Sequence, residues 1–160
     1  MIELEKKWLV DKDKVTIPKT ANKWITVQGY LSYGPGDSWI VRVRSIISSL
    51  GDLPSHPPKF FLELKSKGLL AREELRYIIT EEEFNETFDK CGAIVKKTRY
   101  LWYDINKEYQ YEVDFYDDHD FVTCEVEFKS MKEANEFVPP EWCIEDVTFD
   151  PKYKNMNLGV

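Results

Sequence analysis

Polar and apolar residues alternate along most of the chain with the period of two that is typical of β-strands. In the first ten residues, Glu3, Glu5 and Lys7 fall on one face of a predicted strand. Leu4 and Trp8 fall on the other face. The same alternation, interrupted by Gly, Pro and Asp, predicts eight strands, at residues 1–10, 23–33, 38–48, 59–67, 72–79, 94–105, 108–117 and 120–129.

The connections between these strands are marked by residues that favour turns. Residues 33–37 and 106–107 are predicted to close two hairpins, because Gly, Pro, Asp and Asn supply the backbone angles of tight turns. Residues 48–58 are rich in Ser, Gly and Pro, and we expect an exposed loop there.

Two short helices are predicted among the strands. Thr80 and Glu83 have the spacing of a capping box, which begins a helix over residues 81–90. Ser130 stands in the same position before a second helix over residues 131–137. The fold class is therefore dominated by β-structure with a few short peripheral helices, and eight consecutive strands favour an antiparallel barrel.

Charged residues recur at a spacing of two in several other strands. They are Arg42 and Arg44, Arg72, Glu74 and Arg76, Lys97 and Arg99, Glu112 and Asp114, and Glu125 and Glu127. If these faces point out of a barrel, its interior is an ordinary apolar core that includes Val43, Val113 and Val126. If they point inward, the outer apolar faces need cover from the helices, the C-terminal segment or a partner. The spacing alone leaves both arrangements open.

An inward arrangement requires a ligand, because buried charges without partners cost several kcal/mol each. A polyanion with bound divalent cations would neutralise both the basic and the acidic side chains. Carboxylates hold hard cations through oxygen, while Arg and Lys hold phosphate oxygens.

Length and composition narrow the class of protein. The chain has 160 residues, and we expect residues 1–160 to form a single domain. The formal net charge of −7 argues against nonspecific binding to nucleic acid or to an anionic membrane. Three cysteines without zinc or redox spacing, and a charged N-terminal region, favour a cytoplasmic protein with reduced thiols. A homodimer is compatible with these features.

The charged motifs resemble those of CYTH proteins, the triphosphate tunnel metalloenzymes. The segment Glu3-Leu-Glu-Lys-Lys7, followed by Trp-Leu-Val, is similar to the E-x-E-x-K signature of that family. The resemblance continues in order through QGYL at 28–31, VRVR at 41–44, LELK at 62–65, KTRY at 97–100, EVD at 112–114, CEVE at 124–127 and the closing segment 146–158. It implies an eight-stranded antiparallel tunnel with its charges inward, which binds triphosphate with Mg²⁺ or Mn²⁺ and transfers or hydrolyses the terminal phosphoryl group.

The resemblance also implies roles for individual residues. The metal ligands would be Glu3, Glu5, Asp114, Glu125 and Glu127. The substrate-binding bases would be Lys7, Arg42, Arg44, Lys65, Arg72, Lys97 and Arg99. One position departs from the family: Arg76 stands where the second acid of an R-x-E-x-E motif is usual, which leaves the role of Glu74 open and favours more negatively charged substrates.

Lys7 and Tyr30 are the candidate catalytic residues. Tyr30 is expected on the inward face with Gln28, and Lys7 ends the charged series of the first strand. An ammonium beside a phenol stabilises the phenolate, so Tyr30 would accept a proton from the attacking water. The alternative is that Tyr30 packs in the wall or donates a hydrogen bond to a phosphate oxygen.

Several functions remain open at this stage. Residues 28–30 and 155–158 resemble the bacterial tripolyphosphatases, so hydrolysis of inorganic triphosphate is expected first. The enzymatic alternatives are a nucleoside or thiamine triphosphatase and a class IV adenylate cyclase, although Ile40-Val41 replaces the His-Phe dipeptide associated with those cyclases. A module that binds triphosphate or nucleotide without turnover is the alternative from another class.

Overall fold

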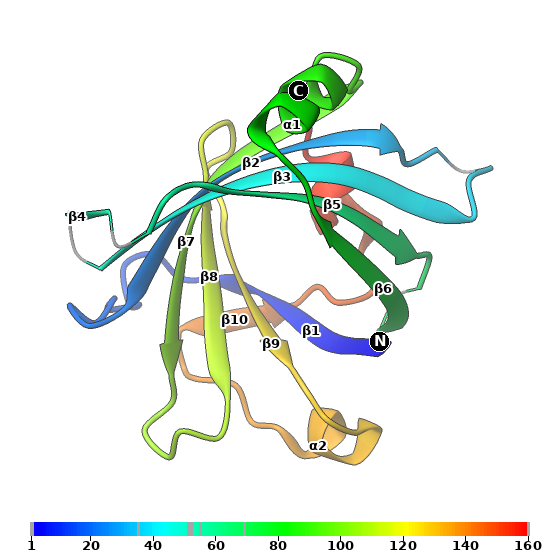
Figure 1. Cartoon of the computed structure of the whole chain (residues 1–160). Coiled ribbons are helices and arrows are strands. Elements are labelled where there is room, and N and C mark those ends of the chain that lie inside the picture. Colours follow the sequence, from blue (N-terminus) through cyan, green and yellow to red (C-terminus); the bar gives the residue numbers. More distant parts are fainter. Residues whose placement is uncertain (1, 35, 51–52, 55, 69, 160) are drawn as a thin grey trace.

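The computed structural model describes residues 2–34, 36–50, 53–54, 56–68 and 70–159. Eight strands close an antiparallel barrel in the order β1-β6-β5-β3-β2-β7-β8-β9, and β9 pairs back to β1 (Figure 1). Their bounds are β1 (Ile2–Val10), β2 (Asn22–Ser32), β3 (Trp39–Leu50), β5 (Lys59–Ser66), β6 (Ala71–Ile78), β7 (Ala93–Tyr103), β8 (Gln110–Tyr116) and β9 (Val122–Glu127). The predicted eight-stranded antiparallel barrel is confirmed.

Two further strands lie outside the prediction. β4 (Leu53–Pro54) pairs with the end of β3, and β10 (Cys143–Asp146) pairs with β1. The loop predicted at residues 48–58 is wrong in two places. β3 continues to Leu50, where its last residues pair with the start of β2, and β4 lies within the predicted range. Residues 51, 52 and 55 of that predicted loop lie outside the described residues.

Both predicted helices form, and each is slightly shorter than expected. In α1 (Glu81–Phe88) the capping box is complete: Glu83 N donates to Thr80 Oγ1 at 3.1 Å, and Thr80 N donates to Glu83 Oε1 at 3.0 Å. α2 (Met131–Glu136) begins after Ser130, and two 3₁₀ turns, η1 (Pro151–Tyr153) and η2 (Asn155–Asn157), follow near the C-terminus. None of the described helices has the length and apolar character needed to cross a membrane.

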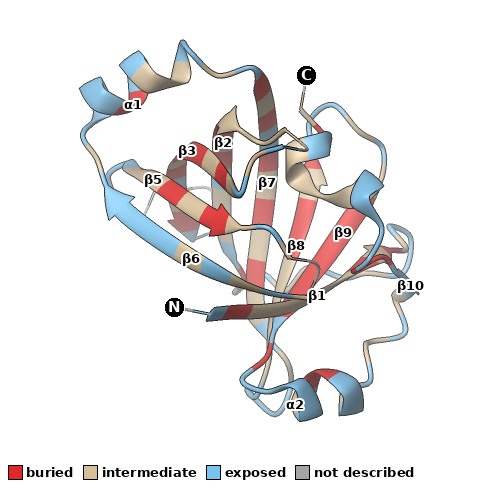
Figure 2. Cartoon of the chain, turned by 90° about the vertical axis from the view of Figure 1, so that its right-hand side faces the viewer, coloured by how far each residue is buried: buried red, intermediate tan, exposed pale blue. Residues whose placement is uncertain are grey.

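The main apolar core lies outside the barrel, against the outer faces of β1, β8 and β9. Trp8, Val113 and Val126 are buried there. The segment after α2 covers them, and the rings of Trp8 and Phe137 are 5.5 Å apart. Figure 2 shows the buried stretches of β8 and β9 above α2. This arrangement agrees with the inward orientation of the charged faces, since the apolar faces are covered from outside.

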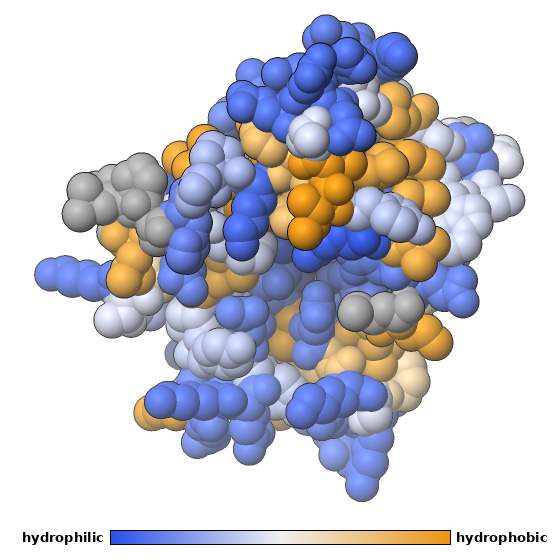
Figure 3. Space-filling model, in the orientation of Figure 1, coloured by the Kyte–Doolittle hydropathy of each residue, from blue (hydrophilic) through white to orange (hydrophobic). Residues whose placement is uncertain are grey.

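A second cover is formed by α1 over β2, β3 and β5. Phe84 of α1 lies 5.3 Å from Phe60, measured between ring centroids. Gly29 of β2 permits the close approach of the C-terminal end of α1, because a Cβ added there would lie 2.6 Å from Cys91 Sγ and 3.1 Å from Phe88 Cδ2. On the outer face of β6, by contrast, Leu75 and Tyr77 are exposed. Figure 3 shows hydrophobic residues gathered on this side of the barrel.

The replacement Gly29→Ala is expected to destabilise the protein through this close approach. Overpacking a filled site costs about 1–3 kcal/mol, which corresponds to a fall in Tm of roughly 2–10 °C for a domain of this size. Gly36→Ala is the matched control, because a Cβ added at Gly36 would meet nothing within 4 Å. Equal Tm values for the two variants in thermal unfolding would show that α1 does not depend on Gly29.

Candidate active site

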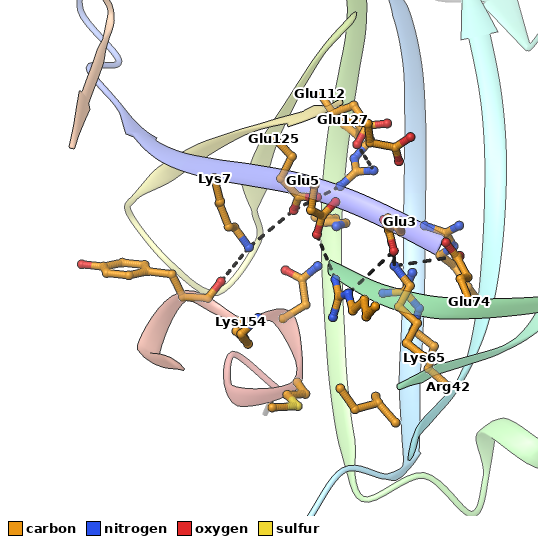
Figure 4. Close-up of a pocket in the computed structure, with 18 of the residues that line it drawn as sticks. Glu3, Glu5, Lys7, Arg42, Lys65, Glu74, Glu112, Glu125, Glu127 and Lys154 are labelled. Carbon is orange, nitrogen blue, oxygen red and sulfur yellow. Dashed lines mark hydrogen bonds and ion pairs between the residues drawn. The ribbon is translucent and has the colours of Figure 1, made fainter. Parts of the chain in front are cut away.

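A cavity of about 210 Å³ lies inside the barrel (Figure 4). All seven of the predicted substrate-binding bases line it, and so do two bases that were not assigned, Arg76 and Lys154. Of the predicted metal ligands, Glu3, Glu5, Glu125 and Glu127 line the cavity. Glu74 and Glu112 line it as well. The charged faces therefore point inward.

Three carboxylates of the cavity form a group that fits a metal ion. Glu3, Glu5 and Glu127 each place an oxygen within 4.8 Å of the others. The pairing of β1 with β9 brings Glu5 opposite Glu127. Glu3 lies two residues before Glu5, on the same face of β1. A set of donors that consists only of carboxylate oxygens suits hard cations such as Mg²⁺ and Mn²⁺.

The surroundings of these three carboxylates shift their pKa values. Burial, together with the charges of Glu125 and Glu3, raises the pKa of Glu5 well above its usual value. Burial and the charge of Glu112 raise the pKa of Glu127. Burial opposes the ionisation of Glu3 as well, but Lys65 and Arg72 outweigh it and lower the pKa of Glu3 to about 2. A bound cation would relieve the repulsion at Glu5 and Glu127.

Millimolar Mg²⁺ or Mn²⁺ is therefore expected to raise the Tm of the protein. A cation at a hundred times its Kd stabilises the folded state by about 2.7 kcal/mol, or roughly 5–10 °C here. The shift should shrink as the pH falls toward 5, because the raised pKa values of Glu5 and Glu127 let protons compete with the metal. Differential scanning fluorimetry with NaCl at equal ionic strength is the control, and equal Tm values would argue against the site.

One part of the basic wall is built around a carboxylate that was not predicted to have a role. Glu63 is fully buried, and its oxygens lie 2.8 Å from Arg44 Nε, 3.4 Å from Arg42 Nε and 3.0 Å from Arg76 Nη2. The Nε–H groups of Arg42 and Arg44 are not directed at these oxygens and have no hydrogen-bond partner, although they are buried. Arg44 Nη2 in addition donates to Glu63 Oε2 at 3.1 Å. Glu63 thus fixes the two guanidinium groups by charge attraction and, for Arg44, by a hydrogen bond.

The pKa of Glu63 reflects this environment. Burial would raise it, but Arg42 and Arg44 outweigh burial and hold it far below the usual range. The role of Glu63 follows from the pairing of β3 with β5, which puts Arg42 directly opposite Glu63. Register between strands, which the alternation does not give, was needed to see it.

Asp114 plays the same part for the second group of bases. Arg99 donates to both of its oxygens, from Nε at 2.7 Å and from Nη2 at 2.8 Å, and Lys97 Nζ donates to Oδ2 at 2.9 Å. Asp114 was predicted as a metal ligand, but the structure places it fully buried behind these bases and outside the group formed by Glu3, Glu5 and Glu127. Burial and the charge of Arg99 outweigh Asp114 at Lys97 and lower the pKa of that lysine to about 7.

Tyr30 lines the cavity, but the cation beside its hydroxyl is not the predicted Lys7. Gln28 Nε2 donates to the Tyr30 hydroxyl at 2.7 Å. Burial lowers the pKa of Arg42, but Glu63 and then Tyr30 outweigh it and raise that pKa, so Arg42 is the cation beside the hydroxyl. Lys7 instead lies 3.4 Å from Glu125 Oε1 and donates to the backbone oxygen of Tyr153 at 2.6 Å.

The fold and the site together define a barrel protein whose cavity is lined by both bases and carboxylates. No protein-family model matches the chain. The chain is 33% identical, over 100% of its own length and 98% of the other protein, to an inorganic triphosphatase of Nitrosomonas europaea. It covers 93% of the crystal structure of the inorganic triphosphatase NE1496, with 98% of this chain aligned, 31% identity and a TM-score of 0.63.

A more distant solved structure, the PH1819 protein of Pyrococcus horikoshii, shares the fold. It has 18% identity and a TM-score of 0.59, over 84% of this chain and 82% of that one. The full-length relationship to the Nitrosomonas protein shows that this chain belongs to the CYTH family of triphosphate tunnel metalloenzymes, in its inorganic triphosphatase branch.

Proposed function

We propose that this protein is a metal-dependent hydrolase of triphosphate and that inorganic triphosphate is its substrate. The observation that carries the proposal is the cavity, which is small and lined by nine basic and six acidic side chains. Its volume of about 210 Å³ is below the range of about 300–1,000 Å³ that is common for organic ligands of drug size. A compact polyanion fits such a site better than a nucleoside triphosphate does.

The bases have the arrangement that phosphoryl transfer requires. Because Glu63 and Asp114 hold the side chains of Arg42, Arg44, Lys97 and Arg99 from behind, these groups are oriented before the substrate arrives. Preoriented charges stabilise a transition state without the cost of reorganisation. We therefore assign Asp114 to positioning the bases.

The proposed metal site consists of Glu3, Glu5 and Glu127, with Glu125 beside them. A bound Mg²⁺ or Mn²⁺ would neutralise phosphate charge and polarise a phosphoryl oxygen. Glu125 lies between Lys7 and Arg99, at 3.4 Å and 3.6 Å, so it also links the acids to the bases. We retain Tyr30 as the candidate that takes a proton from the attacking water, with Arg42 rather than Lys7 as its neighbouring cation.

We further propose that residues 1–160 work as one domain in a reducing cytoplasm. The barrel strands come from positions 2 to 127, and the C-terminal turns line the same cavity. Cys91, Cys124 and Cys143 are all free thiols, as is usual in a reducing compartment.

A phosphate-release assay with Mg²⁺ or Mn²⁺ tests the proposed function. Inorganic triphosphate should be hydrolysed with a kcat/KM at least tenfold above that for ATP, thiamine triphosphate and pyrophosphate. A higher kcat/KM for an organic triphosphate would identify that compound as the substrate instead. Formation of cyclic AMP from ATP would favour the cyclase alternative, and binding without turnover of any of the four compounds would favour a binding module.

A further inference from the structure

One end of the cavity is bounded by buried apolar side chains. Tyr30 and Ile40 line the cavity there, and both belong to a core cluster that also contains Val95 and Leu158. Met156, in the C-terminal turn η2, lines the cavity and packs against the same cluster. A ligand inside the cavity therefore meets a wall at this end.

The opposite end of the cavity reaches solvent. The antiparallel order of the strands brings together the start of β2, the end of β6 and the end of β9 at that end of the barrel. Trp24 lies near the start of β2, Arg76 near the end of β6 and Glu127 at the end of β9, and all three line the cavity. Glu127 is exposed, and the side chain of Arg76 is 47% exposed. A substrate therefore has access from this side.

Trp24 is the largest of the side chains that line this open end. It shares the inward face of β2 with Tyr30, which lies at the bounded end, and both residues line the cavity. Trp24 is half-buried, and strand register puts it directly opposite Arg99 of β7. Asp114 orients the guanidinium group of Arg99 toward the cavity interior. The indole thus borders the route between solvent and one of the substrate-binding bases.

This placement bears on organic triphosphates. In ATP and thiamine triphosphate, the organic group is attached to one end of the phosphate chain. Because buried side chains bound the other end of the cavity, an organic group has to extend through the open end, past Trp24. Inorganic triphosphate carries no such group, so the indole does not obstruct it. A bulky side chain at this position discriminates by shape between the two kinds of substrate.

We propose that Trp24 determines the substrate specificity of the protein, because its indole obstructs the organic group of nucleoside and thiamine triphosphates at the open end of the cavity. This inference rests on the proposed function, since it explains the preference for inorganic triphosphate. Removal of the indole changes which triphosphates fit and leaves the bases that hold the phosphate groups in place.

Steady-state hydrolysis of ATP and of inorganic triphosphate with Mg²⁺ tests this role in Trp24→Ala. We expect kcat/KM for ATP to rise at least tenfold, because the adenosine no longer meets the indole. The value for inorganic triphosphate should stay within threefold of the wild type. Trp24→Phe keeps a smaller ring and should raise the value for ATP by less. A gain of activity toward ATP distinguishes obstruction from a packing role, which would lower both values.

The matched control is Trp39→Ala. Trp39 begins β3, is half-buried like Trp24, and is not among the described residues that line the cavity. Its replacement should leave the ratio of the two kcat/KM values unchanged. Calorimetric titration with imidotriphosphate, an analogue with nitrogen bridges, should give equal Kd values for the wild type and Trp24→Ala. A tenfold weaker Kd in Trp24→Ala would assign Trp24 to holding the phosphate chain and would overturn the inference.

The outcomes separate this inference from the proposed function. If the wild type prefers inorganic triphosphate and Trp24→Ala keeps the same preference, the role of Trp24 is wrong and the proposed function stands. A lower kcat/KM for ATP in Trp24→Ala would show that the indole stacks on the base, which also overturns the inference. If the wild type does not hydrolyse inorganic triphosphate, the proposed function itself fails. Thermal unfolding shows whether Trp24→Ala is folded, and Trp24→Leu gives the same comparison if it is not.

Discussion

Replacing Glu5 with Gln should reduce kcat for inorganic triphosphate by roughly 10³-fold or more, because the variant loses a charged oxygen from the group formed by Glu3, Glu5 and Glu127. The Tm of the metal-free protein should change little. The ion pair of Glu5 with Arg72 is lost, but so is the repulsion from Glu125 and Glu3 that helps raise the pKa of Glu5. Glu5→Gln is therefore expected to lose activity while it keeps the stability of the metal-free wild type.

Glu145→Gln is the control for this variant. Glu145 lies on β10 opposite Leu9 of β1 and is exposed. Its replacement should leave kcat and the Mg²⁺-induced rise in Tm unchanged, whereas Glu5→Gln should abolish that rise. Wild-type activity in Glu5→Gln would show that the acids of the barrel do not form the metal site.

The variant Glu63→Gln should be strongly destabilised. Glu63 is fully buried among Arg42, Arg44 and Arg76, and the amide leaves these three cations to repel one another. Removing one member of a buried ion pair costs about 3–5 kcal/mol, so Tm should fall by roughly 10 °C. Triphosphate with Mg²⁺ should restore part of this loss, because the anion replaces the missing charge.

The control for Glu63→Gln is Glu73→Gln on the neighbouring strand β6. Glu73 is exposed on the outer face of the barrel, and its replacement should shift Tm by less than 1 °C or so. Thermal unfolding of both variants with and without ligand makes the comparison. Equal Tm values would mean that the arginines do not depend on Glu63, and the account of how the bases are oriented would be wrong.

The fold was largely accessible from the sequence because alternation determines which residues share a face. Glu3, Glu5 and Lys7 could be placed together from spacing alone, and the resemblance of the motifs decided that this face points inward. The apolar faces that this choice left outside, with Val113 and Val126, are covered by the segment around α2. The short strands β4 and β10 were not predicted, because strands of two and four residues are too short to show a period of two.

The roles of Glu63 and Asp114 were harder to obtain. Both lie on the charged faces of their strands, as do the acids that line the cavity, so spacing does not distinguish a ligand of a cation from a carboxylate that holds a base. The difference arises from cross-strand register, which puts Arg42 opposite Glu63 and Arg99 opposite Asp114. The position of Lys154 at the cavity was not predicted for another reason. The irregular C-terminal turns have no period from which the direction of its side chain follows.

A crystal structure with Mn²⁺ and imidotriphosphate tests the central claim most directly. We predict an anomalous manganese peak about 2.1 Å from carboxylate oxygens of Glu3, Glu5 and Glu127, with the analogue inside the barrel between Arg42 and Lys7. Manganese bound elsewhere, or an analogue bound outside the barrel cavity, would contradict the account.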